Sequence, residues 1–343
     1  MDVPARRLAG RSLQGGWTVV REIPHPRDHS GGNFSISYEV KRDDGQRAFL
    51  KALDYSRGLG ERDSPSVLKS LLDAYLFERE VLELCANRHM DRVIKAISFG
   101  DILVDEESPI GRVHYLIFEM ADHDLRTFLS SSSTVEPAWK LRLLHHVATG
   151  LHQLHSAGIA HQDTKPSNVA VFKDCSKLSD LGHASRKESI SPRDRNPYAD
   201  PSYAPPELRY NHLDPDWSRR RVGCDLYHLG SMIVFLFTGA SAPALTFSRL
   251  DPHHRPDNWD GTYADVLPYV RNAWGAALTE FSTHIEDEFL RRELTALVSY
   301  LCEPDPSLRG HPSNRTGHAS QLSLERFVSR LNFLAQKAER DLR

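Results

Sequence analysis

The sequence HQDTKPSN at residues 161–168 is followed twelve residues later by DLG at residues 180–182. Phosphoryl transfer requires a carboxylate that orients an acceptor hydroxyl, a cation for the moving phosphate, and oxygen ligands for Mg²⁺. These parts are present here as Asp163, Lys165, Asn168 and Asp180. Because Asp-x-Lys-x-x-Asn arises by chance in roughly a few per cent of chains of this length, the pattern predicts a phosphoryl-transfer site rather than a polar turn.

The two segments resemble the catalytic loop H-R-D-x-K-x-x-N and the D-F-G motif of eukaryotic-type protein kinases, in the form of a divergent Ser/Thr kinase. The resemblance extends from Trp17 to about Leu334. It implies an α+β, bilobal protein-kinase-like fold, in which an N-lobe with a small antiparallel β-sheet and one main helix faces a larger, mostly helical C-lobe. We expect an N-terminal extension at 1–16, the N-lobe at 17–120, the C-lobe at 121–334 and a C-terminal tail at 335–343.

The overall composition bounds the classes of partner. At 343 residues the chain is longer than one average domain, as a bilobal fold requires. Its 43 basic and 46 acidic residues leave a net charge of −3, which gives no electrostatic argument for nucleic acid or an anionic membrane. The resemblance implies a protein substrate, and the charge balance leads us to expect neither nucleic acid nor membrane as a partner. The oligomeric state stays open.

The cysteines and the N-terminal residues indicate the compartment. Four widely spaced cysteines without the paired spacing of zinc ligands predict free thiols in a reducing environment. The first seventeen residues contain no apolar stretch long enough for a secretory signal, so we expect a cytoplasmic protein. The apolar segment 226–245 is interrupted by His228, two glycines and a proline, which predicts a buried core helix rather than a membrane span.

The predicted elements are strands first and helices later. Three runs rich in β-branched and aromatic residues, WTVVREI, SISYEVKR and RAFLKAL, predict an antiparallel sheet between residues 17 and 54. Apolar residues at helical spacing predict a long helix over residues 66–86. The runs VIKAISFG and VHYLIFEM predict two further strands before a hinge near Met120, and a second long helix, apolar from 144 to 154, leads into the catalytic loop.

Lys51 lies in the predicted strand AFLKAL. The resemblance implies that it contacts the α- and β-phosphates of ATP and pairs with a helix glutamate. The helix sequence FEREVLELC offers Glu78 and Glu80, and residues two apart lie on nearly opposite faces of a helix, so only one can face Lys51. We expect Glu80, because the sequence resembles the family's F-x-R-E-V, and Glu78 is the alternative.

The loop SGGNFSIS at residues 30–37 takes the place of the family's phosphate-covering G-x-G-x-F-G-x-V. Gly31 and Gly32 would bring main-chain N–H groups close to phosphate oxygens of ATP, and Phe34 would cover the tip of the loop. A plain hairpin turn has a similar composition. Ser37 and Phe49 depart from the residues that the family usually places around adenine, which leaves the pose of ATP open.

The segment YLIFEMADHDL continues from a predicted strand into the hinge. The resemblance places Phe118 at the back of the ATP pocket and lets the main chain of Glu119 to Ala121 contact adenine. Asp124 is expected to reach the ribose, with capping of the next helix as its alternative role.

The resemblance assigns a role to each residue of the catalytic motifs. Asp163 would act as the catalytic base that orients the acceptor hydroxyl, and Lys165 would stabilise charge on the transferred phosphate. Asn168 and Asp180 would bind Mg²⁺, so ATP and Mg²⁺ are the expected cofactors. Gln162 replaces the family's Arg, which in many kinases binds a phosphate on the activation segment. We therefore expect activity to depend less on phosphorylation of that segment.

The activation segment is expected to run from Asp180 to PPE at residues 205–207, which resembles the family's A-P-E. Glu207 would pair with Arg309, an ion pair that distinguishes protein kinases from small-molecule kinases. Asp225, in GCDLYHLG, resembles the buried helix aspartate that braces the catalytic loop through main-chain N–H groups. A helix cap is the alternative role of Asp225.

The acceptor preference is only partly encoded in these motifs. Lys165 favours Ser and Thr over Tyr, because tyrosine-directed relatives generally have other patterns there. Asp200, in YADPSYAPPE, occupies the place of a Thr that is usual in Ser/Thr kinases, and Ser202 is an alternative occupant of that role. Ser189, Ser191 and Ser202 are candidate sites of autophosphorylation.

The leading hypothesis is an active Ser/Thr protein kinase that transfers the γ-phosphate of Mg-ATP to protein hydroxyls. Two other classes of function stay open. A pseudokinase scaffold would bind nucleotide or a partner without transfer, and the altered glycine loop favours it. A kinase-fold small-molecule phosphotransferase would act on a metabolite, and Lys165 together with the pair of Glu207 and Arg309 argues against it.

Overall fold

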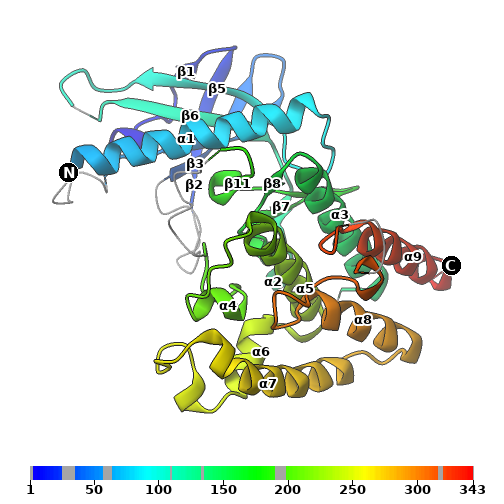
Figure 1. Cartoon of the computed structure of the whole chain (residues 1–343). Coiled ribbons are helices and arrows are strands. Elements are labelled where there is room, and N and C mark those ends of the chain that lie inside the picture. Colours follow the sequence, from blue (N-terminus) through cyan, green and yellow to red (C-terminus); the bar gives the residue numbers. More distant parts are fainter. Residues whose placement is uncertain are drawn as a thin grey trace.

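The computed structural model of the protein describes residues 3–24, 35–56, 64–108, 110–132, 135–189, 198–315 and 320–342. The chain forms two lobes (Figure 1). A twisted sheet with the long helix α1 (Ser64–Asn87) makes up the N-lobe, and helices dominate the C-lobe. This is the predicted bilobal α+β fold.

The described strands of the N-lobe form one antiparallel sheet in the order β1-β2-β3-β4-β6-β5. Their bounds are β1 (Ser12–Leu13), β2 (Trp17–Ile23), β3 (Ser35–Arg42), β4 (Arg47–Leu53), β5 (Ala96–Leu103) and β6 (Arg112–Glu119). The runs WTVVREI, SISYEVKR and RAFLKAL coincide with β2, β3 and β4. Along β4, Ala48, Leu50 and Ala52 are buried on one face of the sheet, so Lys51 must project from the other face.

The segment before Trp17 packs on this sheet. Pro4–Arg6 forms the short helix η1, and Ala5, Leu8 and Leu13 are buried in one cluster with Trp17 and Tyr38. The hydroxyl of Tyr38 donates a hydrogen bond to the carbonyl of Ala5 at 2.7 Å. The apolar face of β2, β3 and β4 is therefore covered by the chain's own N-terminal segment.

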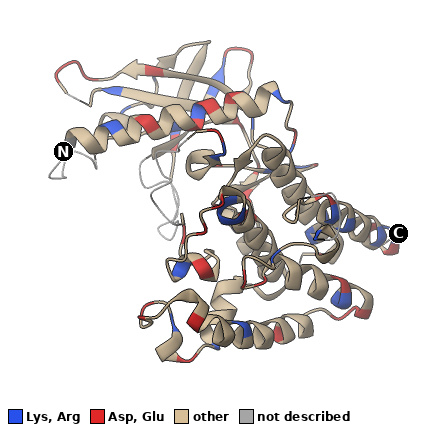
Figure 2. Ribbon diagram, in the orientation of Figure 1, with Lys and Arg blue, Asp and Glu red and all other residues tan. Residues whose placement is uncertain are grey.

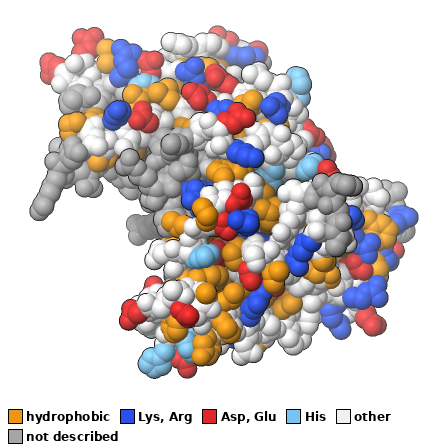
Figure 3. Space-filling view, viewed as in Figure 1, with side chains coloured by type: hydrophobic (Ala, Val, Ile, Leu, Met, Phe, Trp, Pro, Cys, Tyr) orange, Lys and Arg blue, Asp and Glu red, His pale blue; other side chains and the backbone are white. Residues whose placement is uncertain are grey.

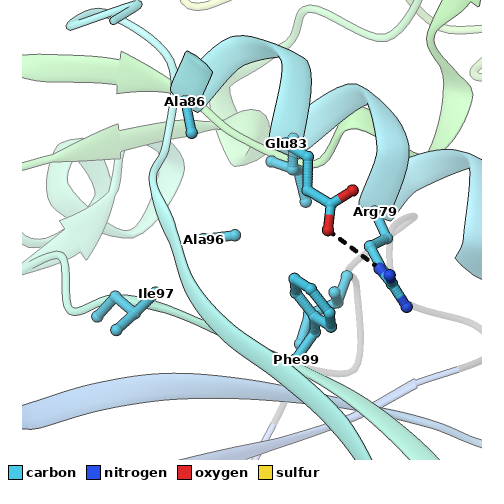
Figure 4. Close-up of a pocket in the computed structure, with 8 residues that line it drawn as sticks. Arg79, Glu83, Ala86, Ala96, Ile97 and Phe99 are labelled. Atoms are coloured by element: carbon cyan, nitrogen blue, oxygen red, sulfur yellow. Dashed lines mark hydrogen bonds and ion pairs between the residues drawn. The ribbon is translucent and has the colours of Figure 1, made fainter.

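The helix α1 packs on the face of the sheet that bears Lys51. Figure 4 shows the contact near β5: the Arg79 guanidinium lies 3.9 Å from the centre of the Phe99 ring and pairs with Glu83. A small pocket of about 60 Å³ remains between α1 and β5. Lys, Arg, Asp and Glu are spaced along α1 (Figure 2), whereas Leu71 and Tyr75 are buried beneath it.

The C-lobe follows a short hinge after Glu119. Its helices are α2 (Leu125–Ser131), α3 (Pro137–Ser156), α4 (Pro206–Arg209), α5 (Gly223–Thr238), α6 (Ala242–Ser248), α7 (Tyr263–Thr283), α8 (Glu288–Leu301) and α9 (Glu325–Asp341). Its short strands are β7 (His123–Asp124), β8 (Ile159–Ala160), β9 (Val169–Val171), β10 (Ser176–Leu178) and β11 (Ser185–Arg186). Single helical turns are η3 (Pro166–Asn168), η4 (Leu181–His183), η5 (Ser218–Val222), η6 (Pro252–His254) and η7 (Pro312–Asn314). The strands β7, β9 and β10 form a small antiparallel sheet, and the pair of β9 and β10 directly follows the catalytic loop in the chain.

The apolar helix α5 is the centre of the C-lobe. Its side chains from Leu226 to Leu236 are almost all buried, as expected for a core helix. Within the described residues, no single helix is long and apolar enough to cross a membrane. The stretches 218–238 and 242–248 reach the required length and hydropathy only together, and they are bent by 78° at their junction.

The C-terminal helix α9 packs along α3. Phe327, Leu331 and Ala335 are fully buried on its inner face. At the edge of this contact the Arg142 guanidinium forms a bidentate ion pair with Glu339, with distances of 2.7 and 2.8 Å. The inner face of α9 is therefore part of the C-lobe core. On the face of the molecule that Figure 3 shows, basic and acidic side chains are interspersed.

A buried histidine on α3 makes the stability depend on pH. The ring Nδ1 of His146 accepts a hydrogen bond from the main-chain N–H of Ser176 at 3.2 Å. Burial, helped by the charge of Arg92, lowers the pKa of His146 to about 4. In the unfolded chain, His146 becomes protonated as the pH falls below about 6.5, whereas in the folded protein it stays neutral until about pH 4. Stability is therefore fully present above pH 6.5 and falls as the pH falls through this window.

We expect the free energy of unfolding to fall by about 3 kcal/mol between pH 6.5 and 4 because of His146 alone. The variant His146→Gln keeps an acceptor for the Ser176 N–H but does not titrate. Urea unfolding of both proteins at several pH values between 7 and 4 checks the expectation. A variant whose free energy of unfolding falls as steeply as that of the wild type would contradict it.

Candidate active site

The catalytic loop between β8 and β9 brings the motif residues into contact with one another. One carboxylate oxygen of Asp163 lies 3.1 Å from the Lys165 ammonium, and the other accepts a hydrogen bond from the Asn168 amide at 2.8 Å. Asn168 also donates to the Asp163 carbonyl at 2.8 Å. The turn of η3, with Pro166 at its start, returns the chain so that residues 163, 165 and 168 face the same side.

Two residues of the site have a left-handed backbone. Gln162 has φ of +69° and Asp180 has φ of +56°. Side chains other than Gly rarely adopt this region, and such residues cluster where the surrounding structure fixes them for a purpose. Here they lie immediately before Asp163 and at the start of the DLG motif, so the strained positions flank the candidate reacting groups.

A buried carboxylate holds the catalytic loop in place. Asp225, on α5, is fully buried and accepts the main-chain N–H groups of His161 at 2.7 Å and Gln162 at 2.8 Å. The His155 ring lies 2.8 Å from the same carboxylate. Burial alone would raise the pKa of Asp225, but the hydrogen bond and charge of His155 outweigh it and lower the pKa. His155 was not singled out from the sequence for this role; it lies in the last turn of α3, before the catalytic loop.

The Lys51 ammonium joins the N-lobe to the C-lobe. It lies 3.0 and 3.1 Å from the two carboxylate oxygens of Glu78, and 2.9 Å from Asp180. The expectation that Glu80 pairs with Lys51 is therefore wrong. The Glu80 side chain is 65% exposed and its carboxylate lies 3.8 Å from Arg186. The packing of α1 determines which glutamate faces Lys51. Glu78 continues the buried row of Leu71 and Tyr75 at helical spacing, whereas Glu80 lies on the outer face of the helix.

This difference between neighbouring glutamates gives a matched pair of variants. Glu78→Gln removes one of the two anions that hold Lys51, so we expect kcat/KM for ATP to fall by about 10²-fold. Glu80→Gln changes an exposed contact and should alter it by less than about twofold. Steady-state kinetics at varied ATP concentration measures both. Equal losses in the two variants would show that Glu78 has no special role.

The DLG motif is shaped by close packing. Leu181, where the resemblance leads one to expect Phe, is fully buried in the core cluster that also contains Val81 and Leu82 of α1. A Cβ atom at Gly182 would lie 3.3 Å from Asp180 and 3.5 Å from Glu78. Glycine at this position therefore allows both carboxylates to approach Lys51, and Leu181 fills the space beneath the helix.

Some of the residues expected around the nucleotide lie outside the described residues, and the hinge residues lie within them. Gly31, Gly32 and Phe34 lie outside the described residues. The Glu119 carboxylate points to Lys177, with distances of 2.8 and 2.9 Å, so any contact of Glu119 and of Ala121 with adenine would come from the main chain.

The Asp124 side chain is engaged locally. One carboxylate oxygen accepts from the Thr127 N–H at 2.9 Å and the other from its hydroxyl at 2.6 Å. Asp124 is thus the N-cap of α2, the alternative role considered from the sequence. A contact with ribose remains a prediction.

The side chains of Asn168 and Asp180 suit a hard divalent cation. The amide nitrogen of Asn168 is bonded to Asp163, which leaves its carbonyl oxygen as the ligand atom. Asp180 adds a carboxylate that is 29% exposed. Oxygen ligands in this small number fit Mg²⁺, which keeps several waters and binds through one or two protein groups and phosphates. Among the described residues no three His, Cys, Asp or Glu side chains gather as a closed metal site.

Burial and neighbouring charges shift the pKa values of Asp163 and Lys51. Burial raises the pKa of Asp163 to about 7, and the nearby Asp180 acts in the same direction. Lys165 and Asn168 act in the opposite direction. Burial alone would lower the pKa of Lys51, but the carboxylates of Asp180 and Glu78 outweigh it and raise the pKa. Lys51 therefore stays charged, and Asp163 has a pKa suited to accepting a proton near neutral pH.

A second buried ion pair supports the end of the activation segment. The Arg309 guanidinium is fully buried and contacts the two carboxylate oxygens of Glu207 at 2.6 and 2.8 Å. Arg309 also donates to the carbonyls of Gly223 at 3.1 Å and Glu303 at 3.1 Å. This pair joins α4, the start of α5 and the loop after α8.

Comparison with known proteins agrees with this geometry. A family model described as the protein kinase domain matches residues 31–319. The chain is 33% identical to the Wee1-like protein kinase of Arabidopsis thaliana over 139 residues, which cover 39% of this chain and 25% of that protein. It is 26% identical to the mitogen-activated protein kinase p38b of Drosophila melanogaster over 185 residues, covering 53% and 44%. It is 31% identical to the serine/threonine-protein kinase NLK2 of Xenopus tropicalis over 171 residues, covering 49% and 34%. The matched region thus spans less than half the length of each of these relatives.

Proposed function

Because the chain belongs to the protein kinase family, we propose that it transfers the γ-phosphate of Mg-ATP to Ser and Thr hydroxyls of protein substrates. The observation that carries the proposal is the convergence of two charged groups of residues on one site. Asp163, Lys165 and Asn168 come from one loop, while Lys51 and Asp180 meet across the lobes at 2.9 Å. Such an arrangement is what phosphoryl transfer requires and what a scaffold does not need.

Each side chain then has a chemical task. Asp163 orients the acceptor hydroxyl and accepts its proton. Lys165 lies beside it, so its ammonium stabilises negative charge on the phosphate in transfer. Lys51, fixed by Glu78, binds the phosphates that are not transferred. Mg²⁺, when bound, neutralises phosphate charge, and Asn168 and Asp180 are the residues that would hold it.

The test is transfer of label from γ-³²P-ATP with Mg²⁺ to the protein itself and to generic protein acceptors. Phosphoamino-acid analysis of the products then identifies the acceptor. We expect label on Ser and Thr in the wild type and none with Asp163→Ala. Label on Tyr would support protein kinase activity but contradict the assignment of Ser and Thr as acceptors. Label on a metabolite panel instead of protein would favour a small-molecule kinase, and binding of ATP without any transfer would favour a pseudokinase.

The Glu207–Arg309 pair supports a protein acceptor. It fixes α4, at the end of the activation segment, to the core of the C-lobe. A fixed end of this segment gives a peptide substrate a firm surface to lie on, and a small metabolite has no need of it. The relatives named above are protein kinases by their names.

The proposed enzyme should be active without phosphorylation of its activation segment. The Gln162 amide donates to the Arg221 carbonyl at 2.7 Å and accepts from the Arg221 guanidinium at 3.2 Å. Position 162 therefore offers no cation to a phosphate group. We expect phosphatase treatment, or replacement of Ser189 and Ser202 by Ala, to change kcat by less than about twofold. A tenfold loss on dephosphorylation would contradict this. Ser191 lies outside the described residues.

A further inference from the structure

Asp200, in the activation segment, is buried against the catalytic loop. Its side chain is 7% exposed, and one carboxylate oxygen lies 3.1 Å from the Lys165 ammonium. Lys165 is 3% exposed and lies at the same distance, 3.1 Å, from Asp163. The ammonium group is therefore held between two buried carboxylates that come from different parts of the chain.

The second carboxylate oxygen of Asp200 shapes its own turn. It accepts the main-chain N–H of Ser202 at 2.9 Å, while the Asp200 carbonyl accepts from Tyr203 at 3.2 Å and Ala204 at 3.0 Å. The Ser241 hydroxyl fixes this turn to the start of α6 by donating to the Ser202 carbonyl at 2.8 Å. These bonds fix the direction of the Asp200 carboxylate within the turn, and the contacts that hold the turn to the rest of the C-lobe include the Ser241 hydrogen bond and the Lys165 ion pair.

A rigid anion matters because Lys165 has a flexible side chain. The four-carbon chain of a lysine leaves its ammonium many positions unless contacts restrict it. With Asp163 as its one contact, the Lys165 ammonium could still take several positions. Asp163 must also orient the acceptor hydroxyl. A second buried anion of fixed position removes that freedom, and charge-assisted contacts of this kind are about twice as strong as those of a neutral hydroxyl.

We propose that Asp200 is a positioning residue for Lys165. Its carboxylate fixes the place at which Lys165 meets the transferred phosphate and, through the same contact, holds the end of the activation segment on the catalytic loop. The inference rests on the proposed function for its kinetic consequence, while the tether itself does not. It also accounts for a carboxylate at a position where the resemblance leads one to expect Thr.

A double-mutant cycle tests whether Asp200 acts through Lys165. We expect Asp200→Ala and Asp200→Asn each to lower kcat by about 10²-fold with an unchanged KM for ATP. Asp200→Asn is informative because its amide oxygen can still accept from Ser202 while the charge is lost. In a Lys165→Met background, Asp200→Ala should cost less than about twofold more. Asp260→Asn, an exposed acid of the same type, is the control that should change nothing.

Two kinetic outcomes overturn the proposal. One is an Asp200→Asn variant as active as the wild type, which would show that the charge is not needed. The other is a further loss of about 10²-fold in the Lys165→Met background, which would show that Asp200 acts independently of Lys165.

Amide hydrogen exchange tests the tether without any catalysis. Lys165→Met leaves the Asp200 turn intact but removes the ion pair, so exchange in residues 198–205 should become about tenfold faster than in the wild type. Unchanged exchange would overturn the proposal. If the wild type transfers no phosphate but Lys165→Met still speeds exchange in residues 198–205, the proposed function is wrong and the tether by Asp200 stands.

Discussion

Replacing Asp163 by Asn will lower kcat by about 10³-fold and leave the affinity for ATP near that of the wild type. A positioned general base contributes roughly 10²–10⁴-fold to a rate. An amide has nearly the size of the carboxylate, but it cannot accept the proton of the acceptor hydroxyl. The Asp163 carboxylate is almost fully buried and is held by Lys165 and Asn168, so no described neighbouring group can take its place without moving the loop.

The measurement is kcat with a protein acceptor at saturating ATP, together with calorimetric titration of nucleotide. Asp174→Asn is the matched control, because Asp174 is exposed in the turn after β9. Its kcat should remain within about twofold of the wild type. An Asp163→Asn protein that keeps a tenth of the activity would show that Asp163 is not the base, even if nucleotide binding is intact.

Removing Arg309 will destabilise the protein by about 3–5 kcal/mol. The guanidinium is fully buried and makes four hydrogen bonds, two of them to the Glu207 carboxylate. It also lies 5.1 Å from the centre of the Tyr227 ring. Arg309→Leu leaves Glu207 as a buried charge without its partner, and the cost of that charge is larger than the net contribution of the intact pair.

Urea unfolding measures the effect, and a double variant separates the two contributions. Adding Glu207→Gln to Arg309→Leu removes the stranded charge and should recover a substantial part of the loss. The exposed pair of Lys337 and Asp341 on α9 is the control, since Lys337→Ala should cost less than about 1 kcal/mol. A loss at Arg309 as small as that at Lys337 would mean that the buried pair adds nothing to the fold.

The sequence was most informative where the interacting residues lie close together in the chain. Asp163, Lys165 and Asn168 meet within one loop, so their spacing almost suffices to bring them together. The strands β2, β3 and β4 were also found at their bounds, because runs of β-branched and aromatic residues separated by polar turns are a local signal. Local chemistry of this kind does not depend on how distant elements pack.

Contacts between distant elements were harder to predict. The choice between Glu78 and Glu80 depends on which side of α1 is turned toward the sheet, and two positions differ by about 200° around a helix. The buried row of Leu71, Tyr75 and Leu82 contains Glu78 at matching spacing, and this signal could have corrected the choice. The contact of His155 with Asp225 had no comparable local signal, because seventy residues separate them.

The sequence by itself thus determined the family and the identity of the catalytic loop, since short-range order and residue type fix them. Only the tertiary structure decided that Glu78 holds Lys51, that Asp124 caps α2 and that Asp200 reaches Lys165. The physical reason is that each of these depends on the rotation of a helix or the path of a loop. Those are set by the burial of apolar side chains over the whole core, and no short stretch of sequence contains that information.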